Sequence, residues 1–179
     1  TPWQQAWQPE LVGTLLFVVD QQRVLLIEKK TGHGMGKINA PGGKWEIGES
    51  LLACARREML EETGVDAQPL DCVAELRFVE RDGPQWLGFV FVARDFTGTL
   101  TETPEAKPFW CDVQDIPYQQ MWADDAIWLP EVLKHGVFGD EPDAPPLVYD
   151  FLFTAGQLLD HRPSDQCGLS LSIHAPRLD

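Results

Sequence analysis

Apolar and polar positions along this chain follow a rhythm that mostly predicts β-strands. Two strand-sized apolar segments, 11–19 and 24–28, are joined by a polar turn at 20–22, and this arrangement predicts a hairpin. A loop with three glycines follows at 31–37, and a short extended piece at 38–41 comes after it. The same pattern predicts further strands at 72–80, 86–94, 109–113 and 148–153.

Helical spacing replaces the strand pattern at residues 50–63. Apolar side chains recur every four positions from Leu51 to Met59, so they form one stripe on a helix. Ser50 precedes the stripe and is suited to cap the first turn, because its hydroxyl can accept a backbone N–H. Gly64 stands where a left-handed C-terminal cap is expected.

A second helix is predicted from Asp124 or Asp125 to His135, with its end at Gly136. Pro130 lies inside this range, where a proline either kinks a helix or marks its first turn.

Strands with a helix on each side predict an α/β fold, namely a three-layer α/β/α sandwich with a mixed β-sheet. Residues 86–93 are almost wholly apolar, which is typical of a strand covered on both faces. The length of 179 residues suits one domain, which we assign to residues 1–153. Residues 154–179 are rich in polar residues, glycine and proline, and we interpret them as a C-terminal tail.

The net charge of the chain limits the kinds of partner that it can bind. The chain carries 28 acidic against 14 basic residues, a net charge of −14, and such a surface repels long polyanions. A long nucleic acid is therefore not expected as a partner, whereas a small phosphorylated ligand is compatible if metal ions neutralise the acids locally. No apolar run reaches the roughly 20 residues of a membrane-spanning helix, and no signal peptide is evident. We expect a cytoplasmic protein, monomeric or homodimeric, without a membrane partner.

The cysteines show no Cys-x-x-Cys pair and no zinc-ligand spacing, so we expect reduced thiols. They stand at Cys54, Cys72, Cys111 and Cys167.

Three glutamates of the first predicted helix carry the strongest chemical signal. Glu58, Glu61 and Glu62 are spaced i, i+3 and i+4, so their carboxylates share one face and repel one another unless a cation lies among them. Hard oxygen ligands of this kind suit Mg²⁺, with Mn²⁺ as a substitute.

Such a charge run is most often only a solvated helix face. Two features of the surroundings argue against that reading here. No Lys or Arg stands at 62, 65 or 66 to balance the acids, whereas Arg57 lies within a turn of Glu61 and can hold its carboxylate. Gly42 and Gly43 let the backbone approach a phosphate closely, and Gly48 permits a sharp loop before the helix.

These residues together resemble the Nudix box at every fixed position. The matching residues are Gly43, Glu49, Arg57, Glu58, Glu61, Glu62 and Gly64, with aliphatic residues at Met59 and Val65. The resemblance implies a strand-loop-helix-loop unit that binds divalent metal and hydrolyses a nucleoside diphosphate linked to another group. It assigns Gly43 and the three glutamates to the metal. We place the three glutamates and Arg57 in the catalytic set, with Arg57 and Glu49 as braces rather than chemical actors.

Outside the box, the chain is similar to the MutT-type group of oxidised-purine nucleoside triphosphatases over roughly residues 12–153. That resemblance places Asn39, Trp122, Asp124 and Asp125 at the purine base, with Thr14 and Lys29 nearby. We also assign Gly42, Gly43 and Lys44 to substrate binding. Glu105 lies in a loop that approaches the metal site in this group, so it is a candidate metal ligand or general base.

Physical chemistry supports the base-binding assignment but also offers an alternative. Two adjacent carboxyls in an apolar pocket can hold charge unequally, so Asp124 and Asp125 can present one donor and one acceptor. Trp122 offers a flat stacking surface. Acidic residues before a helix, however, more often serve as an N-terminal cap. His33 stands where the group carries an aromatic pocket residue, which leaves two interpretations open: a different base preference, or an exposed loop histidine without a function.

The sequence therefore predicts a Mg²⁺-dependent hydrolase that converts oxidised purine nucleoside triphosphates to monophosphate and pyrophosphate. Two alternatives stay open. One is a Nudix hydrolase of another substrate, such as an RNA 5′ end, a dinucleoside polyphosphate or ADP-ribose. The other is a nucleotide-binding module without catalysis.

Overall fold

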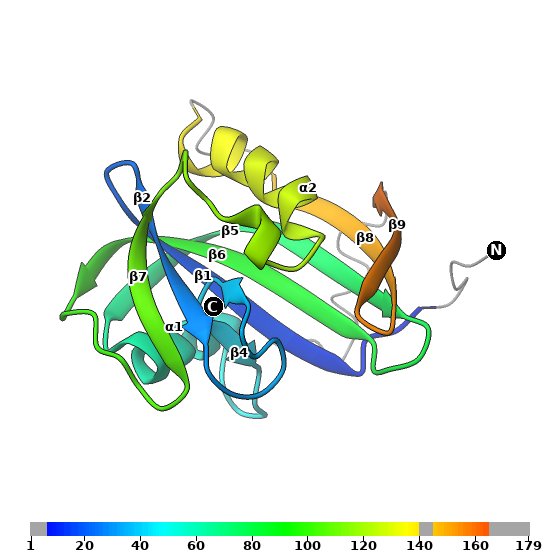
Figure 1. The fold of residues 1–179 in the computed structure, drawn as a ribbon, viewed down its shortest axis with the longest axis horizontal. Coiled ribbons are helices and arrows are strands. Elements are labelled where there is room, and N and C mark those ends of the chain that lie inside the picture. Colours follow the sequence, from blue (N-terminus) through cyan, green and yellow to red (C-terminus); the bar gives the residue numbers. More distant parts are fainter. Residues whose placement is uncertain (1–6, 140–144, 165–179) are drawn as a thin grey trace.

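A mixed β-sheet forms the centre of the computed structural model, which describes residues 7–139 and 145–164 (Figure 1). Within this part of the chain the strands are β1 (Leu11–Asp20), β2 (Arg23–Lys29), β3 (Ile38–Asn39), β4 (Gly42–Lys44), β5 (Asp66–Glu80), β6 (Trp86–Thr97), β7 (Ala106–Asp112), β8 (Leu147–Thr154) and β9 (Gln157–Pro163). The helices are α1 (Leu51–Thr63) and α2 (Asp125–Glu131), and a short 3₁₀ turn, η1, spans Tyr118–Gln120.

The strand order is β3-β2-β1-β6-β5-β8-β9, with β4 paired to β1 and β7 paired to β2. Two neighbouring pairs, β1 with β6 and β5 with β8, are parallel, and the other pairs are antiparallel. The predicted hairpin of the first two strands is confirmed, since Val19 pairs with Val24 across the turn.

Two separate cores cover the two faces of the sheet. On one face, Leu51, Ala55 and Met59 of α1 pack on residues such as Leu16 and Phe91. On the other face, Trp128 and Leu129 of α2 pack in a cluster with Phe17 and Val90. The two helices therefore lie on opposite sides of the sheet (Figure 1), and the predicted three-layer α/β/α sandwich is confirmed. Residues 87–93 of β6 are buried, apart from the half-buried Gly88, as the apolar run predicts.

The ends of α1 form as its sequence predicts. The Ser50 hydroxyl accepts the N–H of Ala53 at 3.0 Å. Gly64 adopts φ 77°, a left-handed conformation that costs glycine little, and its N–H bonds to the Leu60 carbonyl. These caps place the helix start directly after the loop that carries Glu49.

The second helix differs from its prediction at the C-terminal end. The α-helical part begins at Asp125, contains Pro130 and stops at Glu131, and a wider π-helical turn, η2 (Val132–Val137), continues the path. Pro130 is therefore not in the first turn. Because proline lacks an N–H, it removes one helical hydrogen bond, and the wider turn follows directly after it.

Strand β9 was not predicted. It pairs antiparallel with β8, and nearly all of its residues are exposed, so its sequence lacks the apolar alternation typical of a strand. Residues 157–163 thus belong to the sheet, although they fall in the expected tail. Residues 165–179 lie outside the described part of the chain, and the division into a domain and a tail stays a prediction.

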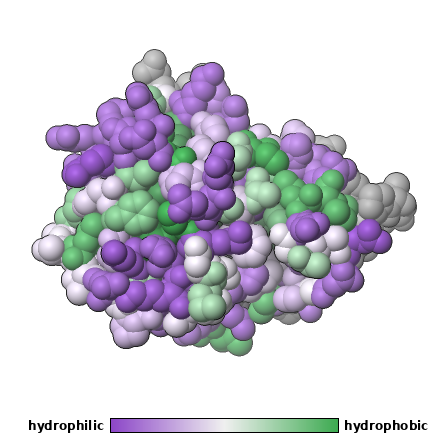
Figure 2. Space-filling view, in the orientation of Figure 1, coloured by the Kyte–Doolittle hydropathy of each residue, from purple (hydrophilic) through white to green (hydrophobic). Residues whose placement is uncertain are grey.

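Mixed hydrophilic and hydrophobic patches cover the face shown in Figure 2. No helix among the described residues is long and apolar enough to span a bilayer. The cysteines in this part of the chain, Cys54, Cys72 and Cys111, are free thiols, whereas Cys167 is outside it.

Candidate active site

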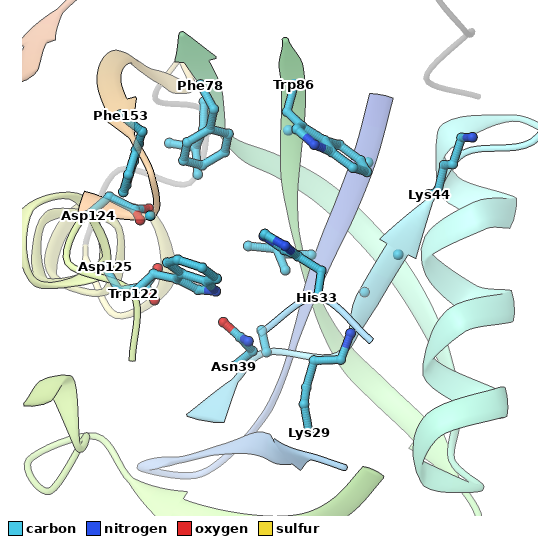
Figure 3. A pocket seen from close by; sticks show the side chains of 18 of the residues that line it. Lys29, His33, Asn39, Lys44, Phe78, Trp86, Trp122, Asp124, Asp125 and Phe153 are labelled. Atoms are coloured by element: carbon cyan, nitrogen blue, oxygen red, sulfur yellow. The ribbon is translucent and has the colours of Figure 1, made fainter. Parts of the chain in front are cut away.

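A cavity of about 640 Å³ opens on the α2 side of the sheet and extends to the N-terminal glycines of the Nudix box. Figure 3 shows Asp124, Asp125 and Trp122 on one side of this cavity and Lys44 on the opposite side. Every predicted substrate-binding residue lines it: Thr14, Lys29, Asn39, Gly42, Gly43, Lys44, Trp122, Asp124 and Asp125. The cavity volume is within the range of about 300–1,000 Å³ that is common for small-molecule sites.

Glu62 and Glu58 of α1 approach the glycines of β4. The Glu62 side chain is buried, and its Oε1 accepts the N–H of Gly42 at 2.9 Å. A Cβ placed on Gly43 would lie 2.3 Å from Cδ of Glu58, so any larger residue would displace that carboxylate. The backbone itself requires glycine at 42, because a Cβ there would lie 1.9 Å from the Thr14 carbonyl oxygen of β1.

Burial disfavours the charged forms of these two glutamates. Removal from water raises the pKa of Glu62 to about 7, even though the Gly42 N–H and the charge of Lys29 act in the opposite direction. Burial also raises the pKa of Glu58, and the charges of Glu61 and Glu105 add to that rise. The acids therefore repel one another electrostatically, as their spacing predicts.

Arg57 holds the glutamates of the box in a network. Its Nε and Nη2 donate to the two carboxylate oxygens of Glu49, at 3.0 and 2.7 Å. Its Nη1 donates to Glu58 Oε1 at 2.9 Å and lies 3.5 Å from Glu61 Oε2. These hydrogen bonds from Arg57 lower the pKa of Glu49. The geometry is that of a brace, which is the role that we expect for Arg57.

Two acidic candidates remain accessible to solvent. The side chain of Glu61 is half exposed, and Glu105 is exposed in the loop before β7. The charge of Glu105 raises the pKa of both Glu58 and Glu62, so it lies near the other acids.

At the other end of the cavity, Asp124 and Asp125 are buried although both are charged residues. Asp124 Oδ2 accepts the indole N–H of Trp128 at 2.8 Å. Among the described residues, no hydrogen-bond partner reaches the buried Oδ2 of Asp125. Asp124 precedes α2 but makes no side-chain cap hydrogen bond, so capping does not explain this pair.

Burial raises the pKa of Asp124 to about 6. The pKa of Asp125 is raised well above its usual range, first by burial and then by the charge of Asp124. The pair therefore keeps a proton to higher pH than ordinary aspartates do, and in that state it offers both a donor and an acceptor.

The glycine-rich loop contacts Trp122. The His33 ring stacks on it with a centroid distance of 5.0 Å and an interplanar angle of 15°. The Lys37 ammonium lies 4.9 Å from the centroid of the indole. Burial and the charge of Lys29 lower the pKa of His33, which favours its neutral ring. The sequence did not predict that Trp122 already stacks on a side chain of this protein.

The remaining polar residues line the space between the two ends. Asn39 is the last residue of β3, and Lys29 is the last residue of β2. Lys29 lies near Glu62 and His33, and its positive charge lowers the pKa of both side chains. The Thr14 hydroxyl is buried and lies 3.5 Å from the Cys54 sulfur. Burial raises the pKa of the Cys54 thiol to about 12, so this cysteine is unsuited to act as a nucleophile.

Aromatic residues complete the cavity, and the sequence did not assign them to it. Phe78, Trp86 and Phe153 line it, together with the turns at 82–84 and 155–156. Apolar residues in strands predict burial, but the sequence pattern does not distinguish a packed core from a cavity wall.

The NUDIX domain model matches residues 9–132 of this chain. The chain therefore belongs to the Nudix family, and it is a Nudix hydrolase. It is similar to the oxidized purine nucleoside triphosphate hydrolase of Danio rerio, with 40% identity over 122 residues that cover 68% of this chain and 78% of the relative. The Mus musculus protein of the same name is 38% identical over 126 residues, which cover 70% of this chain and 81% of the relative.

A similar solved structure is that of the mutator MutT protein from Bacillus halodurans, with a TM-score of 0.71 and 31% identity. The structural similarity covers 85% of this chain and 96% of the Bacillus halodurans chain. The predicted resemblance to the Nudix box and to the MutT-type group is confirmed.

Nudix hydrolases generally use divalent metal ions. The donors of this site suit such an ion, since they are hard carboxylate oxygens whose buried charges repel one another. In the described residues, however, no three His, Cys, Asp or Glu side chains form a metal-binding group. Arg57 contacts Glu58 and Glu61, and Gly42 contacts Glu62, so these carboxylates are drawn towards different partners.

Proposed function

We propose that this chain hydrolyses oxidised purine nucleoside triphosphates, such as 8-oxo-dGTP, to the monophosphate and pyrophosphate with the help of Mg²⁺. The observation that carries the proposal is the single cavity with two different ends. At one end, a buried carboxyl oxygen of Asp125 has no hydrogen-bond partner among the described residues, and at the other end Glu62 of the Nudix box lines the cavity. The names of the Danio rerio and Mus musculus relatives support this substrate class.

The base would bind at the aspartate end. A protonated carboxyl of the Asp124 and Asp125 pair donates a hydrogen bond, and an ionised one accepts. Asn39 adds an amide that can do both. Oxidation at C8 turns N7 of guanine from an acceptor into an N–H donor, so a rigid set of donors and acceptors can distinguish the two bases.

The phosphates would bind at the glutamate end. Glu58, Glu61, Glu62 and Glu105, with the Gly43 backbone, would hold Mg²⁺. Bound there, the metal would offset charge on the phosphate oxygens and lower the pKa of a water molecule.

Two lysines of the chain place positive charge along the path of the phosphates. Lys29 lies near Glu62, and Lys44 lies at the far margin of the cavity (Figure 3).

We assign proton acceptance from the attacking water to Glu58 or Glu105, with attack at the β phosphorus. Burial raises the pKa of Glu58, which makes its carboxylate a stronger proton acceptor.

The test compares kcat/KM for 8-oxo-dGTP, dGTP, dATP, 2-oxo-dATP, 8-oxo-dGDP and ADP-ribose, with Mg²⁺ present and products identified. Preference for an oxidised purine triphosphate, with release of pyrophosphate and loss of activity in EDTA, supports the proposal. Preference for ADP-ribose or the diphosphate would move the activity to another substrate. Binding of nucleotides without turnover of any compound would show a binding module, and both of these results overturn the proposal.

A further inference from the structure

One threonine hydroxyl joins the loop that carries Glu105 to the end of α1. Oγ1 of Thr103 accepts the backbone N–H of Glu105 at 3.3 Å and that of Ala106 at 3.2 Å. The same hydroxyl lies 3.3 Å from the carbonyl oxygen of Glu62 and can donate its proton there. It therefore contacts two segments that each carry one of the candidate acids.

The hydroxyl proton has two carbonyl oxygens within reach. The Ala106 carbonyl, at 3.4 Å, already accepts the N–H of Thr103 at 2.9 Å. Glu62 lies in the last turn of α1, where a carbonyl group lacks a partner within the helix. Donation to Glu62 therefore satisfies the group in greater need of a hydrogen bond, and it ties the loop to the helix.

Lys30 holds the same loop from the side of β2. Its backbone N–H donates to the Glu105 carbonyl at 2.9 Å, and its ammonium donates to the Thr103 carbonyl at 3.0 Å. The ammonium also forms an ion pair of 2.8 Å with Glu102. The loop is thus fixed between α1 and the residue after β2, although most of its residues are exposed.

Electrostatic repulsion explains why this loop needs to be held. The charge of Glu105 raises the pKa of both Glu58 and Glu62, so the three carboxyls lie near one another although they belong to different segments. Carboxylates in such a group repel one another, and a loop without restraint would relieve the repulsion by moving Glu105 outwards into water. The hydrogen bonds of Thr103 oppose that movement.

We propose that Thr103 is a positioning residue that keeps Glu105 beside Glu58 and Glu62 for the hydrolytic step. The inference rests on the proposed function, in which Glu105 binds the metal or accepts the proton of the attacking water. Thr103 does not line the cavity, so it acts through the backbone at 105 and 106. Its role is separate from recognition of the base and applies to any nucleotide that the enzyme hydrolyses.

The experiment compares kcat and KM for 8-oxo-dGTP in the wild type, Thr103→Val and Thr103→Ser. Valine has nearly the shape of threonine but no hydroxyl, whereas serine keeps the hydroxyl. Thr103→Val should lower kcat by about tenfold and change KM by less than about twofold, and Thr103→Ser should recover most of the rate. Thr101→Val is the matched control and should behave as the wild type, because the Thr101 hydroxyl donates to the Thr99 carbonyl within the same loop.

A double-mutant cycle shows whether Thr103 acts through Glu105. Glu105→Gln alone should lower kcat by about tenfold or more, and Thr103→Val added to it should lower kcat further by less than about twofold. Hydrogen exchange of the Glu105 and Ala106 backbone N–H groups, measured by NMR, should be faster in Thr103→Val and unchanged in Thr103→Ser.

Equal losses of kcat from Thr103→Val with and without Glu105→Gln would overturn the inference, as would a normal kcat in a folded Thr103→Val protein. Melting temperatures show which variants are folded, and Thr103→Ala supplies a second variant without the hydroxyl. A normal kcat in Glu105→Gln would also overturn the inference, but it would leave the proposed function intact with Glu58 as the proton acceptor. If the wild type hydrolyses ADP-ribose and not 8-oxo-dGTP, the proposed function fails, and the same cycle on ADP-ribose decides the role of Thr103.

Discussion

Arg57 binds Glu49 through two parallel hydrogen bonds while its third nitrogen holds Glu58. The loop before α1 and the acidic face of α1 are thereby fixed to each other. Forked pairs of this kind are stronger than single contacts and set the orientation of both partners.

We predict that Arg57→Gln lowers kcat by about tenfold or more, because Glu58 then loses its orientation. The loss of stability should be about 1–2 kcal/mol, since the pair is only partly exposed. Steady-state kinetics and urea unfolding measure the two effects. Arg56→Gln is the matched control, since Arg56 makes a similar fork with Asp66 on the exposed side of α1. Equal kinetic effects of the two variants would show that the Glu49 fork has no positioning role.

Replacement of Glu61 or Glu62 by Gln should reduce kcat by about a hundredfold or more while the protein stays folded. Gln at 62 keeps an oxygen that can accept the Gly42 N–H, so the fold loses little. Circular dichroism checks folding, and Glu131→Gln in α2 controls for the loss of one negative charge. Near-normal rates in both variants would remove these residues from the mechanism.

The Asp124 and Asp125 pair predicts a dependence of stability on pH. Both pKa values are raised by burial in the folded protein, so the pair favours folding at low pH. That contribution is lost as pH rises from the ordinary value of 3.8 through about 6 and beyond. Asn at position 125 cannot ionise, so the Asp125→Asn variant does not lose this contribution as pH rises. The melting temperature of the variant minus that of the wild type should therefore increase from pH 4 to pH 8. A constant difference over that range would contradict a raised pKa.

The same pair predicts how substrate binding depends on pH. KM for the nucleotide should rise in alkaline solution as the shared proton is lost, and Asp125→Asn should flatten this rise because its amide keeps a donor. The check is a pH profile of kcat/KM for both proteins. Parallel profiles would show that the proton on this pair does not contribute to binding.

The cap of α1 can be tested without touching the site. Ser50→Ala removes the acceptor for the Ala53 N–H and should destabilise the protein by about 1 kcal/mol. Thermal unfolding at several urea concentrations gives the value. Ser50→Asp, which restores an acceptor, should recover most of the loss, and failure to recover it would show that the hydroxyl has a different role.

Local signals explain which parts of the structure could be predicted from the sequence. Ser50 and Gly64 act within one turn of the helix that they end, so α1 was predicted to within a residue. The fixed spacing of Glu58, Glu61 and Glu62 likewise predicted the acidic face. Their partners could not be predicted, because the contact between Glu62 and Gly42 depends on how α1 packs on β4.

The features that could not be predicted depend on contacts between residues far apart in the sequence. Strand β9 was missed because its residues are mostly exposed, and only its pairing with β8 reveals it. Phe78 and Trp86 were assigned to strands, but only the packing of the whole sheet shows that both line the cavity. The stack of His33 on Trp122 joins residues far apart in the sequence, and no pattern in the sequence indicates it.

The span of the cavity has a consequence for the biogenesis of the enzyme. Thr14 and Gly156 line the same cavity, 142 positions apart (156 minus 14). The Nudix box ends at residue 65 and the NUDIX match at residue 132. Both can therefore be synthesised before Phe153 and the turn that follows it. Contacts between such distant segments form late, because closing a long loop has a high entropic cost. A nascent chain released near residue 132 would therefore carry all the glutamates of the box but lack Phe153 and the turn at 155–156, which line the cavity.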